Sequence, residues 1–168
     1  MKKLLFILAL LFLQSAIAKG VYQTPLAFIE QAFSGDIPAV STVWMTKEKK
    51  QVISDILQHS PGFIRVRYWQ RGSKTAWILN EIGKEKPITV GVVLEHGQIK
   101  QLKVLTFRES RGWEVKHDFF TRQFNNASIT DSLQLNQSID GISGATLSVR
   151  ALKKIARIVL YLEQHTNQ

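Results

Sequence analysis

The stretch from Pro87 to Phe107 constrains the fold of this 168-residue chain more than any other segment. Apolar residues run almost without a break over 88–94, and a second apolar stretch, 99–105, follows the turn Glu95-His96-Gly97. Two runs rich in β-branched residues around a short glycine-containing turn predict a β-hairpin. This hairpin is the clearest β signal in the sequence.

The flanking segments predict the rest of an α+β domain. Strands are expected in three further segments: 40–45, 64–69 and 74–80. Helices are expected after the N-cap residues Thr24 and Thr46, the second from Lys47 to about His59, and apolar spacing predicts a terminal helix over 149–162. With no internal repeat or linker, we expect a single α+β domain with a mainly antiparallel sheet, flanking helices and a C-terminal helix.

The first 18 residues have the organisation of an export signal. Lys2-Lys3 precede an apolar run over 4–13, and Ala16-Ile17-Ala18 has the small-residue pattern of a cleavage site. The run is too short to span a bilayer, which takes about 20 residues; an uncleaved anchor or a buried helix is the alternative. Cleavage after Ala18 would place the mature chain in the periplasm or at the outer face of the cytoplasmic membrane.

Charge and cysteine content limit the possible functions. Lys and Arg total 22 against 13 Asp and Glu, a net charge of +9, but an exported protein does not normally meet nucleic acid, so we expect no nucleic-acid partner. The lack of cysteine excludes disulfides, iron–sulfur clusters, thiol catalysis and lipoprotein acylation. The four histidines are far apart in the chain and do not predict a metal site.

Residues 139–148 carry the strongest local signal for a ligand. The segment Ile139-Asp-Gly-Ile-Ser-Gly-Ala-Thr-Leu-Ser148 places two glycines and three hydroxyls directly before the terminal helix. Small residues at a helix N-terminus let backbone N–H groups approach an anion, which predicts a phosphate cradle. A plain loop with an N-cap serine or threonine is the alternative. No lysine follows as in a Walker loop, and the glycine spacing of a hydrolase elbow is missing.

This segment resembles the covalent flavin attachment signature of the FMN-binding domain family, found in the C subunit of sodium-pumping NADH:quinone reductase and the G subunit of Rnf complexes. The family pattern D-x-x-[S/T]-G-A-[S/T] is filled at every fixed place by Asp140, Ser143, Gly144, Ala145 and Thr146. The resemblance implies that Thr146 is esterified to the phosphate of FMN. It also implies that a separate flavin transferase adds the group from FAD.

A second segment, 106–113, resembles the E-T-P-G loop of the same family. Glu109 and Gly112 hold their places, whereas Ser110 and Arg111 depart from Thr-Pro. In the family this loop lies near the isoalloxazine ring. The resemblance covers roughly residues 86–161, which divides the chain into an export signal (1–18), an unassigned part (19–85) and an FMN-binding core (86–168).

Neighbours of this loop are further candidates for contact with the flavin. Trp113 or Phe107 would stack on the ring, with core packing as the alternative for Trp113. Arg108 or Arg111 would stabilise negative charge on a reduced flavin.

The terminal helix carries a basic stripe made of Arg150, Lys153, Lys154 and Arg157. The stripe is either a solvated face, a phosphate-binding element, or a docking surface for an acidic partner or an anionic membrane. Arg150 follows Thr146 by one turn and is the expected phosphate ligand, with Ser148 as a further candidate.

Together these features predict an exported electron-transfer flavoprotein. It would relay electrons between donor and acceptor proteins, membrane-bound ones included, as a carrier and not as a stand-alone catalyst. The alternative is a periplasmic binding or accessory module of the same fold that is never flavinylated. A flavin-dependent reductase acting on a small substrate is a third hypothesis, and no catalytic pair in the sequence supports it.

Overall fold

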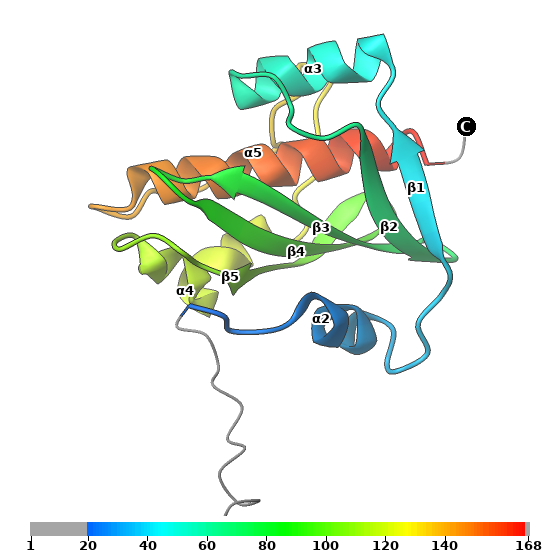
Figure 1. Ribbon diagram of the computed structural model, residues 1–168, viewed down its shortest axis with the longest axis horizontal. Helices are drawn as coiled ribbons and strands as arrows, with labels where there is room; N and C mark the ends of the chain where they lie inside the picture. The colour runs from blue at the N-terminus through cyan, green and yellow to red at the C-terminus, as the bar shows by residue number, and fades with distance from the viewer. Residues whose placement is uncertain (1–19, 167–168) are drawn as a thin grey trace, which may run out of the picture.

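The computed structural model describes residues 20–166, which form one domain around a single sheet (Figure 1). The predicted export signal, 1–18, lies outside the described residues. Within 20–166, no helix combines the length and the apolar character needed to cross a bilayer.

The sheet has five strands in the order of the chain, and every neighbouring pair is antiparallel. Its strands are β1 (Val40–Trp44), β2 (Arg65–Arg71), β3 (Lys74–Ile82), β4 (Pro87–Glu95) and β5 (Gln98–Thr106). The predicted hairpin is the pair β4 and β5. His96 and Gly97 both have positive φ, 52° and 72°, as a tight hairpin turn between twisted strands requires.

Three helices of two or more turns pack around this sheet: α2 (Pro25–Ala32), α3 (Lys47–Leu57) and α5 (Thr146–Glu163). The hydroxyls of Thr24 and Thr46 accept hydrogen bonds from backbone N–H groups of α2 and α3, at 3.2 and 3.3 Å, so both predicted N-caps are confirmed. The short helices η1 (Trp113–Lys116), α4 (Asp118–Thr121) and η2 (Arg122–Phe124) follow β5. The predicted α+β class is confirmed.

Layers on both faces bury the strand β4, which lies between β3 and β5 in the sheet. The helix α5 lies across one face and α2 lies on the other (Figure 1). On the α2 side the ring of Phe28 sits directly over Gly91, where an added Cβ would lie 2.6 Å from the ring. Residues 88–94 of β4 are all buried, which accounts for their unbroken apolar run.

Candidate functional site

The N-terminus of α5 lies at the centre of the predicted attachment segment. Thr146 is the first residue of the helix and is exposed, and Ala145 occupies the N-cap position. Alanine has no side-chain acceptor, and among residues 20–166 no side chain caps this helix. The alternative of a serine or threonine N-cap is therefore wrong, and the first N–H groups of α5 remain available to an anion.

The two segments predicted to bind the cofactor meet in one cleft. Its volume is about 550 Å³, and the residues that line it come from the turn after β3, the loop after β5 and the start of α5. They are Lys84, Glu109, Ser110, Arg111, Gly144, Ala145, Thr146, Leu147 and Ser148. The fold thus brings together loops that are about 35 residues apart in the sequence.

Gly112 allows the two loops to approach this closely. Its φ is +82°, a backbone conformation that favours glycine. A Cβ at this position would lie 2.7 Å from the Ser148 hydroxyl and 3.4 Å from Ala145. Ser148 is only 4% exposed, so its hydroxyl packs against Gly112 and belongs to the wall of the cleft.

Glu109 fixes the turn that closes one side of the cleft. Its Oε1 accepts hydrogen bonds from the backbone N–H groups of Lys84, Glu85 and Lys86, at 2.6, 2.7 and 2.9 Å. Burial alone would raise the pKa of Glu109, but these donors lower it below its ordinary value, so the group is held as a carboxylate. Glu109 was predicted as a cofactor-binding residue; here it positions Lys84 at the rim of the cleft.

The candidates for stacking on the flavin differ in exposure. Trp113 is 45% exposed, so the alternative that it packs in the core is wrong. Phe107 is 3% exposed and part of the main core, so it cannot stack on a ligand. Sequence reasoning could not separate these two aromatic residues because both flank the same loop.

The candidate arginines also divide into two kinds. Arg108 donates to the carbonyl of Pro87 and the hydroxyl of Thr89, at 2.9 and 3.0 Å, and so braces the edge of β4. Arg111 is exposed and lines the cleft. Lys84, also on the cleft, was missed at the sequence level because it belongs to neither of the two matching segments.

The remaining motif residues shape the loop. Gly144 has a φ of +81° with open space where a Cβ would point, so it supplies a turn that leaves room beside Thr146. Asp140 and Ser143 are exposed and lie outside the lining of the cleft. The backbone N–H of Asp140 donates to the Gln123 side chain at 2.7 Å, which ties the loop to η2.

Thr146 also lines a second cleft, of about 590 Å³, on its other side. The four residues of the basic stripe line this cleft too, but two of them are already bound within the protein. Lys154 lies 3.1 Å from the buried carboxylate of Glu81, and Arg157 donates to the carbonyl of Leu133 at 2.6 Å. The stripe is therefore not a uniformly solvated face. Arg150 remains exposed, one turn from Thr146.

These residues fit an FMN phosphate. Thr146 presents an exposed hydroxyl, the start of α5 presents backbone N–H groups, and Arg111, Lys84 and Arg150 supply positive charge on two sides. No group of three or more metal-ligating side chains occurs among residues 20–166.

Comparison with known families supports this assignment. Residues 83–160 match the family model of the FMN-binding domain. No curated protein matches the chain. The matched segment begins at the turn held by Glu109 and ends near the C-terminus of α5, so it contains both loops of the cleft. Residues 83–160 therefore belong to the FMN-binding domain family, and the protein is a flavin-binding protein.

Proposed function

We propose that this protein carries FMN covalently on Thr146 and works as an exported electron carrier. The observation that supports this most strongly is the position of Thr146. Its hydroxyl is exposed at the uncapped N-terminus of α5, between two clefts that both carry basic side chains. An acceptor for a phosphodiester needs such an exposed oxygen with nearby compensation for the phosphate charge.

In the attachment step, FMN would be transferred from FAD to the hydroxyl of Thr146. Thr146 Oγ forms a bond to the phosphorus on the FMN side of FAD, the pyrophosphate bond breaks, AMP leaves, and the hydroxyl proton goes to solvent. In the described chain, no His or carboxylate forms a hydrogen bond to Thr146 that would activate its oxygen. The flavin transferase would therefore supply the base and the magnesium ion.

Once attached, the phosphodiester keeps one negative charge, and the chain's own residues would stabilise it. The N–H groups of Thr146, Leu147 and Ser148, in the first turn of α5, would hold it, and the dipole of α5 has the favourable sign. Arg150 on one side and Arg111 on the other would add charge-assisted hydrogen bonds. The bound flavin supplies the capacity to accept and release one or two electrons.

The wider role follows from the sequence. An export signal would place the protein in the periplasm or at the outer membrane face, where a covalent link retains the flavin. The chain has no nicotinamide fingerprint and no second cofactor motif, so its electron donor and acceptor would be other proteins, membrane-bound ones included.

The test is co-expression of the full chain with an active flavin transferase, followed by denaturation. We expect flavin fluorescence and an FMN mass increase to stay with the wild-type polypeptide and with Ser148→Ala. Thr146→Val should lose both, while Thr146→Ser should keep them because it retains a hydroxyl. A colourless wild type of unmodified mass would contradict the proposal.

A further inference from the structure

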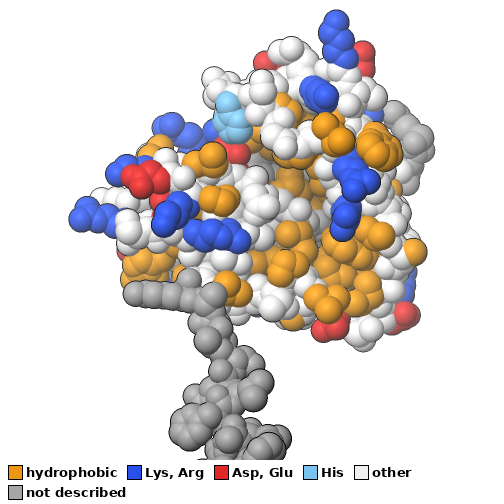
Figure 2. All heavy atoms as spheres, viewed as in Figure 1, with side chains coloured by type: hydrophobic (Ala, Val, Ile, Leu, Met, Phe, Trp, Pro, Cys, Tyr) orange, Lys and Arg blue, Asp and Glu red, His pale blue; other side chains and the backbone are white. Residues whose placement is uncertain are grey.

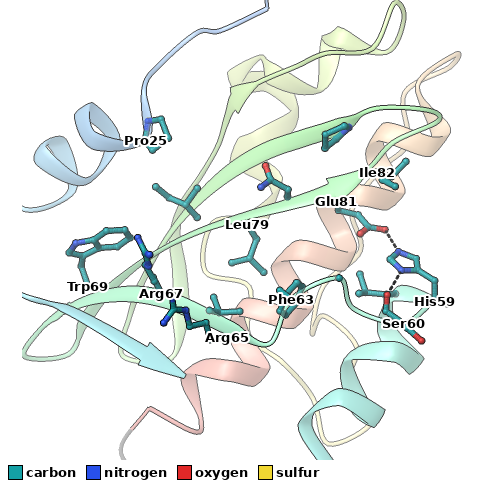
Figure 3. A pocket seen from close by; sticks show the side chains of 16 residues that line it. Pro25, His59, Ser60, Phe63, Arg65, Arg67, Trp69, Leu79, Glu81 and Ile82 are labelled. Carbon is teal, nitrogen blue, oxygen red and sulfur yellow. Dashed lines mark hydrogen bonds and ion pairs between the residues drawn. The ribbon is translucent and has the colours of Figure 1, made fainter. Parts of the chain in front are cut away.

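The strands β2 and β3 part halfway along their length. They pair from Tyr68↔Trp77 to Arg71↔Lys74, beside the turn that joins them. Beyond this point, residues 65–67 pair only with β1 and residues 78–82 pair only with β4. The opening is a cleft of about 670 Å³, larger than either cleft beside Thr146 (Figure 3).

Most of the cleft is apolar. Its apolar lining comes from α3, both strands, the segment between α3 and β2, and the ends of α2 and β4: Pro25, Leu57, Phe63, Val66, Trp69, Ile78, Leu79, Ile82 and Pro87. Figure 2 shows hydrophobic side chains on the floor of this hollow, with Lys or Arg side chains beside it. Pockets of this size with apolar walls and a few convergent polar groups typically hold small organic ligands.

Within the described residues, no carboxylate neutralises the positive charge that Arg65 and Arg67 bring to the cleft, although the Arg65 guanidinium lies 5.6 Å from the centre of the Trp44 ring. Arg65 and Arg67 are exposed on the same wall, and within residues 20–166 neither forms an ion pair. Arg71, on the same strand outside the cleft, pairs with Asp36 at 2.8 Å. Two neighbouring guanidinium groups without a counter-ion repel each other, and an anion bound between them removes that repulsion.

The acidic residue of the cleft is already neutralised. Glu81 is 5% exposed, and its Oε1 lies 3.2 Å from His59 Nε2 (Figure 3). The same Oε1 lies 3.1 Å from Lys154 Nζ. This carboxylate therefore does not repel an anion, and it is not free to bind a cation. The cleft favours a ligand that is apolar at one end and anionic at the other.

The cleft is separate from the flavin site. The turn held by Glu109 stands between them: Ile82 and Pro87, on either side of this turn, line the apolar cleft, and Lys84 within it lines the cleft at Thr146. In the part of the chain that the structure describes, no residue lines both clefts.

We infer that this cleft binds a free aliphatic carboxylate. Its alkyl chain would lie on the apolar floor, and its carboxylate would lie at Arg65 and Arg67. This inference goes beyond the proposed function and does not depend on it.

The first test is a calorimetric titration of hexanoate, octanoate and decanoate, below their micelle concentrations, into the flavin-free and flavinylated protein. Affinity should rise about fourfold for each methylene buried. Both protein forms should give the same affinities, and decyltrimethylammonium should bind at least ~10-fold more weakly than decanoate. The inference would be overturned by equal affinities for decyltrimethylammonium and decanoate, by affinities that do not depend on chain length, or by loss of binding on flavinylation.

The second test uses variants of β2. The double variant Arg65→Gln/Arg67→Gln should weaken decanoate binding about 10-fold. Arg71→Gln removes one arginine from the same strand but outside the cleft, and should leave decanoate binding unchanged. Equal losses in the two variants, tighter binding of an extended acidic peptide than of decanoate, or binding only to phosphatidylglycerol vesicles would contradict the inference. If the double variant does not fold, the affinities of the wild type for decanoate and decyltrimethylammonium still test the inference.

Discussion

Two clefts lie on opposite sides of the turn from Gly83 to Lys86, and they are built differently. The cleft at Thr146 consists of two short loops and a helix end, and backbone groups supply most of its chemistry. The apolar cleft consists of side chains from the distant segments that meet where β2 and β3 part.

This difference in construction decides whether each site can be recognised from the sequence. Loops that position backbone N–H groups need glycines and small residues at fixed spacing, so the site at Thr146 leaves a readable motif. A cleft between parting strands needs only apolar side chains and a gap in strand pairing, and such residues have the same pattern as ordinary core residues. The first site can be found by motif and the second only by geometry.

The largest expected effect tests the floor of the apolar cleft. Within residues 20–166, Lys154→Met leaves the Glu81 carboxylate, which is 5% exposed, with the His59 ring as its single ion-pair or hydrogen-bond partner. Removing one member of a buried ion pair is strongly destabilising, and we expect a loss of about 3 kcal/mol in the free energy of unfolding. Urea denaturation measures it.

The adjacent Lys153→Met is the matched control. Lys153 is half-buried on the same helix and forms no ion pair within residues 20–166, so the change should cost less than about 0.5 kcal/mol. Equal losses for the two variants would show that the Glu81 pair does not stabilise the cleft.

A smaller effect is expected in the loops of the cleft at Thr146. Gly112 and Gly144 have nearly equal φ, +82° and +81°, but only at Gly112 would a Cβ collide, with the Ser148 hydroxyl. Gly144→Ala should cost about 1 kcal/mol for backbone strain alone, and Gly112→Ala about 2 kcal/mol because strain and collision add.

Thermal denaturation of both variants measures the difference between them. Gly141→Ala, in open space without positive φ, serves as the control and should change the midpoint little. If Gly112→Ala and Gly144→Ala melt at the same temperature, the two loops do not touch as described.

The smallest expected effect depends on pH. Glu109→Gln keeps an acceptor but removes the charge that three N–H groups stabilise, which should cost about 1 kcal/mol at neutral pH. The pKa of Glu109 is lowered in the folded protein, so its contribution is present above its ordinary value near 4.5. That contribution is lost as the pH falls through the folded pKa.

Urea midpoints of the wild type and Glu109→Gln should therefore differ at pH 7 and converge in acid. A difference that stays constant down to low pH would mean that the hydrogen bonds, and not the charge, hold the turn.

Much of the fold could be predicted because local chemistry decides it. Thr24 and Thr46 mark helix starts, and the two apolar runs around the turn at His96-Gly97 mark a hairpin. The end of the second helix was placed less accurately. It ends at Leu57 because Gln58 adopts a left-handed conformation, with φ of 62°, which is unusual for glutamine and has no sequence signal.

For the site at Thr146, the sequence predicts the acceptor hydroxyl, but it does not predict which neighbouring side chains line the cleft. Thr146 is identified by a contiguous motif. The exposure of Trp113 and the burial of Phe107, in contrast, depend on which of the two side chains faces the core. The role of Glu109 depends on a turn 23 to 25 residues away. Contacts between distant segments leave no pattern in a single sequence, so these assignments needed the structure.

The most direct test of the central claim is the position of the flavin on the chain. Trypsin would release residues 123–150 as one peptide, because no Lys or Arg lies between Arg122 and Arg150. In protein matured with an active flavin transferase, fragment-ion mass spectrometry of this peptide should place the FMN mass on Thr146. FMN on another hydroxyl of the peptide, or an unmodified peptide, would contradict the claim.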